Sequence, residues 1–169
     1  MINGLKDAIA KSKIARLKNS FSQEFKLPVQ SVVVVLDSQN LSNLPVLMKL
    51  KKELKLEDSK FQVVLFENKN ESFPEFEGLI FTKEDFDFLG NFKSTELMRF
   101  AGNNIDLLIT FANENTLYVD LFIASCKAGL KVGRHVDNED ILNLIIRSGD
   151  EVEVFTSELI KYLKKFKSN

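Results

Sequence analysis

The feature that most constrains the fold is a run of branched apolar residues from Ser31 to Leu36, with the sequence SVVVVL. A strand with one face in water alternates apolar and polar residues, because successive side chains point to opposite faces of the sheet. This run does not alternate, so both of its faces must be covered. Strands of that kind belong to parallel sheets that carry helices on both sides. The run therefore predicts an α/β protein with this strand at the centre of its sheet.

Helical and strand patterns alternate along the rest of the chain. Leucines three or four residues apart between 44 and 54 predict a helix that crosses over to a second strand at residues 61–66. Such an alternation predicts a three-layer sandwich, Rossmann-like, around a mostly parallel sheet of five or six strands. The further strands are expected at residues 78–81, 105–111, 130–136 and 141–146, and the further helices at residues 94–100, 116–127 and 152–166.

Residues 1–27 are predicted to form a basic amphipathic helix ahead of a single Rossmann-like α/β domain at residues 28–169. The first 30 residues carry a net charge of +4, and the rest of the chain carries −5. A basic helix of this kind can touch an anionic surface such as RNA or lipid headgroups. We expect instead that its apolar stripe docks on the domain while its lysines face water. The stripe consists of Leu5, Ile9, Ile14, Leu17, Phe21 and Phe25.

The composition predicts an ordinary soluble globular protein. The chain has 169 residues, of which 44% are hydrophobic and 28% charged, so it can bury a core without a disulfide or a metal. Cys126 has no second cysteine to pair with, and neither a leader nor an apolar run long enough to span a bilayer is present. We therefore expect a cytoplasmic protein with no membrane span and no nucleic-acid partner. One cysteine and one histidine also exclude a zinc site of the Cys/His kind within one chain, and no metal is predicted.

Polar residues follow the two strands that flank the predicted switch point, where the strand order reverses. In open parallel sheets ligands bind there, outside the carboxyl ends of the strands. With a Rossmann-type order, the switch point lies between the strands that end at Leu36 and Phe111. The polar residues there predict a ligand site, although helix caps and turns need the same residue types. The candidates are Asp37, Ser38 and Asn40 after the first strand and Asn113, Asn115 and Thr116 after the other.

The turn after the central strand, Asp37-Ser-Gln-Asn-Leu-Ser, contains no glycine. Dinucleotide-binding and P-loop proteins need glycine at this turn so that the backbone can approach the phosphates. The Asp37 carboxylate would also repel a pyrophosphate. The sequence therefore disfavours both classes of nucleotide site, and no cofactor is predicted.

A second set of candidates is basic. Lys131, Arg134 and His135 follow one another near a strand end and predict contact with an anion, although the alternative is a solvated loop mouth. Cys126 and His135 would be the partners of a nucleophilic dyad. However, Cys126 lies on a predicted helix among small apolar residues, where a cysteine more often fills the core. We therefore predict no catalytic residue.

Three stretches carry a resemblance to known families. They are Asp106-Leu-Leu-Ile, Ala124-Ser-Cys-Lys-Ala-Gly-Leu-Lys-Val-Gly-Arg134 and Tyr162-Leu-Lys-Lys. The chain resembles an uncharacterised bacterial family of small Rossmann-like α/β domains. It is also similar to the N-terminal half of heptosyltransferase-type glycosyltransferases. That family has a Gly-Asp loop where this chain has Asp37-Ser-Gln-Asn, and its donor-binding second domain has no counterpart in this chain, so no catalytic residue is carried over.

Two hypotheses about function follow. The favoured one is a non-catalytic domain that binds a protein partner or assembles with itself through phenylalanines between Phe73 and Phe92, and burial of these rings would remove its main support. The alternative is a domain that binds a small molecule or a nucleotide derivative, related to half of a glycosyltransferase. Its contacts would be Asp37, Asn40, Asn113 and Thr116, and a crevice filled by side chains would count against it.

Overall fold

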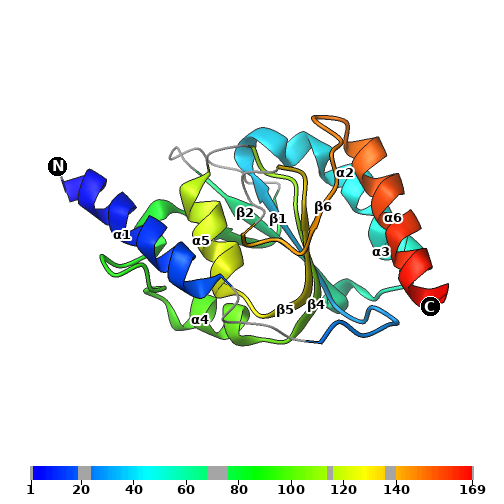
Figure 1. Cartoon of the computed structure of the whole chain (residues 1–169), viewed down its shortest axis with the longest axis horizontal. Helices are drawn as coiled ribbons and strands as arrows, with labels where there is room; N and C mark the ends of the chain where they lie inside the picture. Colours follow the sequence, from blue (N-terminus) through cyan, green and yellow to red (C-terminus); the bar gives the residue numbers. More distant parts are fainter. Residues whose placement is uncertain (1, 19–23, 68–75, 114–115, 136–139, 169) are drawn as a thin grey trace.

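The computed structural model describes residues 2–18, 24–67, 76–113, 116–135 and 140–168. In this part of the chain six parallel strands form one sheet in the order β3-β2-β1-β4-β5-β6 (Figure 1). The predicted parallel sheet is thereby confirmed, and its order is that of a Rossmann fold. The strands are β1 (Val32–Asp37), β2 (Phe61–Phe66), β3 (Leu79–Phe81), β4 (Ile105–Thr110), β5 (Ala128–Gly133) and β6 (Leu144–Ile145).

Strand β1 lies at the centre of the sheet, as its unbroken apolar sequence predicts. It pairs in parallel with β2 on one side and with β4 on the other. All six of its residues are buried. The strand order reverses between β1 and β4, so the carboxyl ends of these two strands define the switch point.

Helices cover both faces of the sheet (Figure 1). Helices α2 (Leu44–Leu47), α3 (Lys49–Glu53) and α6 (Val152–Ser168) pack on one face. Helices α1 (Ile2–Leu17), α4 (Thr95–Gly102) and α5 (Leu117–Ser125) lie on the other. No helix among these described residues is long and apolar enough to cross a membrane.

Several element boundaries differ from the sequence prediction. The single crossover helix is instead a 3-10 turn, Ser38–Asn43, followed by the short helices α2 and α3. Strand β5 begins at Ala128 rather than at Leu130, because Gly129 continues the chain into the strand instead of ending a helix. An added Cβ on Gly129 would lie 3.0 Å from the carbonyl oxygen of Asp106, so this glycine allows the two strands to pack closely.

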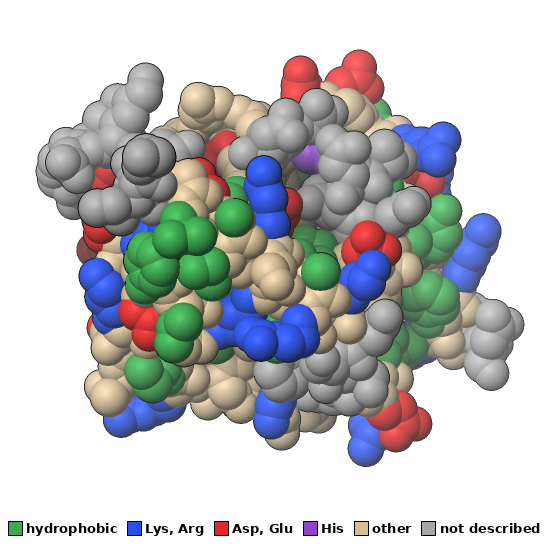
Figure 2. Space-filling model, turned by 60° about the vertical axis from the view of Figure 1, so that its left-hand side comes forward, with side chains coloured by type: hydrophobic (Ala, Val, Ile, Leu, Met, Phe, Trp, Pro, Cys, Tyr) green, Lys and Arg blue, Asp and Glu red, His purple; other side chains and the backbone are tan. Residues whose placement is uncertain are grey.

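Most of the phenylalanines that favoured a protein-binding surface are core residues. The rings of Phe81, Phe86 and Phe92 are buried. Phe88 alone among the described phenylalanines between 76 and 92 is exposed, at 43%, while Phe73 lies outside the described residues. The face that carries α1 and α4 still shows hydrophobic side chains beside basic ones (Figure 2). The support that the sequence lent to a broad phenylalanine surface is therefore removed, and one exposed tip remains.

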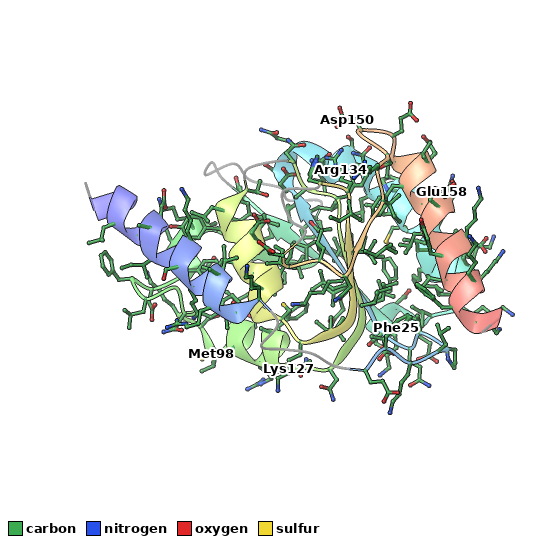
Figure 3. The ribbon with its side chains drawn as sticks, viewed as in Figure 1. Phe25, Met98, Lys127, Arg134, Asp150 and Glu158 are labelled. Carbon is green, nitrogen blue, oxygen red and sulfur yellow. The ribbon has the colours of Figure 1, made fainter. Side chains whose placement is uncertain are left out.

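The N-terminal helix is shorter than residues 1–27 and only partly as predicted. Ala10, Ile14 and Leu17 pack against the core on the α5 side, whereas Leu5 is exposed. Phe25 lies beyond the helix, on the other side of the sheet, where its ring meets that of Phe166 at 6.1 Å (Figure 3). The predicted stripe fails at its C-terminal end because the helix ends at Leu17, and at its N-terminal end Leu5 is exposed. Phe21 lies outside the described residues.

Two lysines of α1 donate hydrogen bonds to backbone carbonyls elsewhere in the chain, where the sequence predicted that they face water. Lys6 Nζ donates to the carbonyl of Lys83 at 3.1 Å, and Lys13 Nζ donates to that of Gly90 at 2.9 Å. These bonds add to the contact between Tyr118 and Asp7, whose carboxylate accepts the phenol hydroxyl at 2.6 Å. That bond is the main reason why the pKa of Asp7 is lowered, and burial raises the pKa of Tyr118.

Candidate functional site

The switch point gathers buried polar side chains. Asp37 is the last residue of β1, and Asn40 lies in the 3-10 turn that follows it. Thr110 ends β4, and Asn113 follows three residues later. Asp37, Asn40 and Thr110 are buried. Because β1 and β4 are parallel neighbours, residues that follow them in sequence reach the same edge of the sheet.

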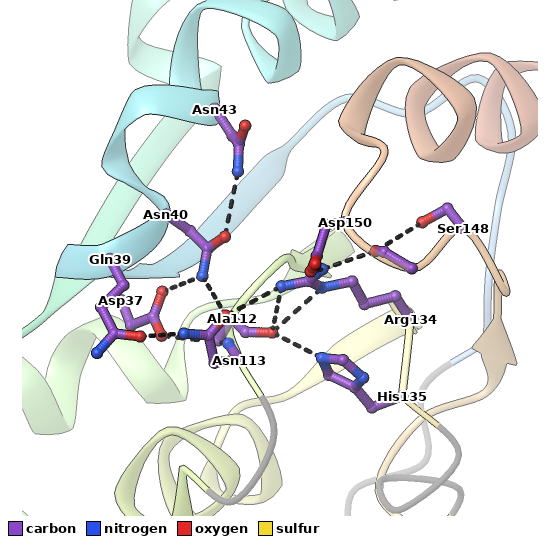
Figure 4. A network of polar contacts seen from close by, with 11 residues as sticks. Asp37, Gln39, Asn40, Asn43, Ala112, Asn113, Arg134, His135, Ser148 and Asp150 are labelled. Carbon is purple, nitrogen blue, oxygen red and sulfur yellow. Dashed lines mark hydrogen bonds and ion pairs between the residues drawn. The ribbon is translucent and has the colours of Figure 1, made fainter.

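Three of the predicted site residues are in direct contact (Figure 4). Asn40 Nδ2 donates to Asp37 Oδ1 at 2.6 Å and to Asn113 Oδ1 at 2.9 Å. The backbone N–H of Asn113 donates to the second carboxylate oxygen of Asp37 at 3.1 Å. Asn43 Nδ2 donates to Asn40 Oδ1 at 3.1 Å, so the oxygen of the Asn40 amide also has a partner. The Asp37 carboxylate therefore joins the loops after β1 and β4.

Arg134 brings a buried positive charge to the same place. It follows β5, and its side chain is 1% exposed, with the guanidinium 3.9 Å from the ring centre of Phe111. Its Nε and Nη2 donate to the carbonyl of Ala112 at 3.3 and 3.2 Å, and Nη2 also donates to Asn113 Oδ1 at 3.3 Å. Its Nη1 donates to Gly149 O at 2.6 Å and to Asp150 Oδ1 at 2.8 Å.

We call Asp37, Asn40, Asn113 and Arg134 the switch-point network. All five N–H groups of the arginine and both of the Asn40 amide have acceptors within it or beside it. No buried side-chain polar atom of the described residues lacks a partner. The inner part of the crevice is thus filled, and this network holds the loops in place rather than leaving a charge free for a ligand.

Partly exposed groups lie at the edge of the network. Asn113 and Gln39 are in contact through their amides, and Thr116 donates its hydroxyl to Asn113 O at 3.1 Å. The Ser38 hydroxyl has no hydrogen bond within the described residues. His135 Nε2 lies 3.1 Å from Ala112 O, beside the arginine. Asn115, which the sequence also nominated, falls outside the described residues.

The predicted basic cluster does not come together as a unit. The side chains of Arg134 and His135 both contact the carbonyl oxygen of Ala112. Lys131 instead points to the other face of the sheet, where Nζ donates to Ile123 O at 2.7 Å. Successive residues of a strand point to opposite faces of the sheet. Lys131 and Arg134 are three positions apart, so their side chains lie on opposite faces. The anion contact predicted for all three would have to lie on both sides of the sheet.

The burial of Lys131 predicts a pH-dependent stability. Burial lowers the pKa of its amine from the ordinary 10.5, so folding releases protons near that pH, and the wild type gains stability as pH rises toward 10.5. Lys131→Met removes the buried charge, while Ile123 O still accepts the N–H of Cys126. We expect the variant to be about 1 kcal/mol more stable at pH 7, with a smaller difference at pH 9.5, measured by urea unfolding. A variant that is less stable at pH 7, or a difference that does not shrink, would contradict this.

Cys126 and His135 do not form a dyad. Cys126 is fully buried just before β5, and burial raises the pKa of its thiol to about 12. His135 follows the other end of that six-residue strand, so the whole strand, roughly 20 Å long at about 3.3 Å per residue, separates the two residues. The prediction that this cysteine fills the core is therefore confirmed.

The sequence did not identify the part of the site contributed by the loop before α6. Gly149 and Asp150 bind Arg134 from that loop, and the Asp150 side chain is 99% exposed. A solvated acidic residue in a loop carries no local signal for such a contact. The pairing of Arg134 with the Asp37 side of the site was equally hidden, because nothing in the local pattern says which face of β5 each side chain takes.

Comparison with known proteins places the chain in a family. A family of unknown function, DUF6913, matches residues 5–166. The chain belongs to DUF6913. The match includes most of α1 as well as the sheet, so the family spans both parts of the predicted domain organisation. No curated protein and no solved structure matches the chain, and the predicted similarity to glycosyltransferases and the bacterial origin are not shown by these comparisons.

Proposed function

We propose that this DUF6913 member is a non-catalytic binding domain that holds a small hydroxyl-bearing molecule, such as a sugar or a nucleoside, at the rim of its switch point. The filled inner crevice counts against contacts from Asp37 and Asn40 themselves, so the ligand lies outside these side chains. One observation carries the proposal. The buried switch-point network fixes partly exposed hydrogen-bonding groups at the carboxyl ends of β1 and β4, where open parallel sheets bind ligands. The binding domain comprises residues 28–169, with α1 packed on it.

The chemistry of the rim favours an uncharged ligand. The rim groups with remaining hydrogen-bonding capacity include the Ser38 hydroxyl, the Gln39 amide nitrogen and the lone pairs of the Thr116 hydroxyl. These are neutral donors and acceptors. The positive charge of Arg134 is enclosed and fully bonded, so a phosphate would first have to displace Asp150. Hydroxyl groups need no such displacement.

A thermal-shift assay tests the proposal with sugars, nucleosides and their phosphates as probes. A neutral probe at 100 times its dissociation constant adds about 2.7 kcal/mol of stability, which is a rise in Tm of about 5–10 °C for a chain of this size. Gln39→Ala and Thr116→Val should abolish the rise. Both side chains are partly or fully exposed, so these variants are expected to fold, whereas Asp37→Ala would strand buried partners.

Gln62→Ala is the matched control, because Gln62 is an exposed glutamine on β2 away from the carboxyl end of the strand. It should keep the full shift. The proposal fails if no neutral probe stabilises the protein, or if a stabilising probe acts equally on Gln39→Ala, Thr116→Val and the wild type. A shift produced by phosphates alone would also reject an uncharged ligand.

A further inference from the structure

A pinned hairpin presents two apolar side chains to solvent. Phe86 and Phe92 form an antiparallel bridge, and the loop Asp87–Asn91 between them closes with Asp87 N donating to Asn91 O at 2.7 Å. At its tip, Phe88 is 43% exposed and Leu89 is 63% exposed. The flanking rings are buried, so the base of the hairpin belongs to the core while its tip does not.

The hairpin is held in this shape by several contacts. Asp87 Oδ1 accepts the N–H groups of Leu89 at 2.8 Å and of Asn91 at 2.9 Å. Burial opposes ionisation of this carboxyl, but these N–H groups hold its pKa below the usual value. Gly90 has a φ of +79°, which favours glycine at that turn position. Lys13 of α1 reaches across to the Gly90 carbonyl at 2.9 Å. The apolar tip is therefore fixed in an outward position.

A groove of about 530 Å³ runs between α1, the hairpin and α4 beside this tip. Its apolar lining includes Leu17, Phe92 and Met98, and Met98 is 50% exposed. Of the large exposed hydrophobic side chains, Met98 lines the groove, and Phe88 and Leu89 belong to the hairpin loop whose ends, Asp87 and Asn91, also line it. Exposed apolar groups that do not serve the core mark interaction surfaces when they cluster.

The charged residues that line the groove are Lys13, Lys127 and Asp87, which are two positive and one negative. Lys127 lines it, is exposed, and has no side-chain partner among the described residues. Lys93 and Arg99 are likewise exposed, and each is next in the chain to a lining residue, Phe92 and Met98 respectively. The acidic residue of the lining, Asp87, already accepts two backbone N–H groups. Met98 and Lys127 come to the same side of the molecule from α4 and from the end of α5 (Figure 3).

We propose that this groove binds an acidic amphipathic segment of a protein partner, whose apolar face covers Phe88, Leu89 and Met98 while its carboxylates face Lys127 and Arg99. Apolar anchors at the centre with charges at the rim are the usual arrangement of such surfaces. The groove is lined by residues that precede β4 and β5, at the opposite end of the sheet from the switch point. Binding here is therefore separate from the proposed ligand site.

The test uses the full chain and two synthetic 18-residue helical peptides in a fluorescence anisotropy titration. Both carry leucines on one face, and the other face carries glutamates in one peptide and lysines in the other. We expect the glutamate peptide to bind and the lysine peptide to bind at least about tenfold more weakly. Phe88→Ser with Leu89→Ser should weaken binding of the glutamate peptide about tenfold or more, and Lys127→Glu should reverse the preference between the peptides.

Val154→Ser is the matched control, since Val154 is an exposed apolar residue of α6 on the other face of the sheet. It should leave binding unchanged, and circular dichroism should show that all variants fold. Equal binding of both peptides, no binding of either, or binding that survives the double variant would overturn the proposal. Sedimentation equilibrium of the protein alone separates one more case. Self-association that the double variant abolishes would mean that a second copy, not a separate acidic partner, occupies the groove.

Discussion

Replacing Arg134 with methionine is expected to lower the free energy of unfolding by about 3 kcal/mol. Methionine has a similar length and can still cover the ring of Phe111. It cannot donate to Ala112 O, Gly149 O or Asn113 Oδ1, so Ala112 O and Asn113 Oδ1 keep only their contacts with His135 and Asn40. The source of the loss is the set of charge-assisted hydrogen bonds that the buried guanidinium makes. Urea unfolding followed by circular dichroism at pH 7 measures it.

Asp150→Asn is the control for this prediction. The aspartate is also bonded to Arg134, but its side chain is exposed to water, and surface ion pairs contribute about 1 kcal/mol or less. We therefore expect the variant to lose less than about 1 kcal/mol. If Arg134→Met is no more destabilising than Asp150→Asn, the backbone carbonyls around the guanidinium do not depend on it, and the structural role assigned to the network is wrong.

Replacing Phe122 with alanine is expected to lower the free energy of unfolding by about 4 kcal/mol. Phe122 is fully buried on α5, and its ring centre lies 4.5 Å from that of Phe81 in a stacked arrangement. It also meets Phe92 at 5.7 Å and Phe100 at 6.1 Å. The substitution leaves a cavity among three large rings that cannot all move to fill it. Calorimetric or denaturant unfolding gives the change.

Phe88→Ala tests the same residue type at the exposed hairpin tip. Because its ring remains largely in water in the folded protein, we expect a loss of less than about 1 kcal/mol. Similar losses in the two variants would show that the ring cluster on the α5 face is not tightly packed. Phe88→Ala has a second use, since it should weaken binding of the glutamate peptide without unfolding the protein.

Part of the candidate site could be predicted because the topology of the sheet determines which strand ends lie together. Once β1 is read as a central strand and β4 as its neighbour, residues that follow the two strands must reach one edge of a parallel sheet. Asp37, Asn40 and Asn113 meet there for that reason. The position of Lys131 could not be predicted in the same way, because a shift of one residue in a strand moves a side chain to the other face.

The phenylalanines show the opposite case. A segment rich in phenylalanine and acidic residues has no clear period, so the sequence could not tell Phe86 and Phe92 in the core from Phe88 in water. Tertiary contacts decided it. The turn at Gly90 and the Asp87 hydrogen bonds hold the tip of the hairpin, with Phe88, in water. The base of the hairpin packs on α5 through the contact of Phe92 with Phe122.

The sequence by itself determined the class of fold, because hydrophobic periodicity and β-branched runs are local properties that set which faces each element must bury. The six-stranded parallel sheet and the polar residues at its switch point follow from that pattern. Only the tertiary structure decided that Asp150 closes on Arg134, that α1 ends at Leu17, and which side chains stay in water. These features depend on contacts between residues far apart in the chain, and no local pattern encodes the loop paths that bring such residues together.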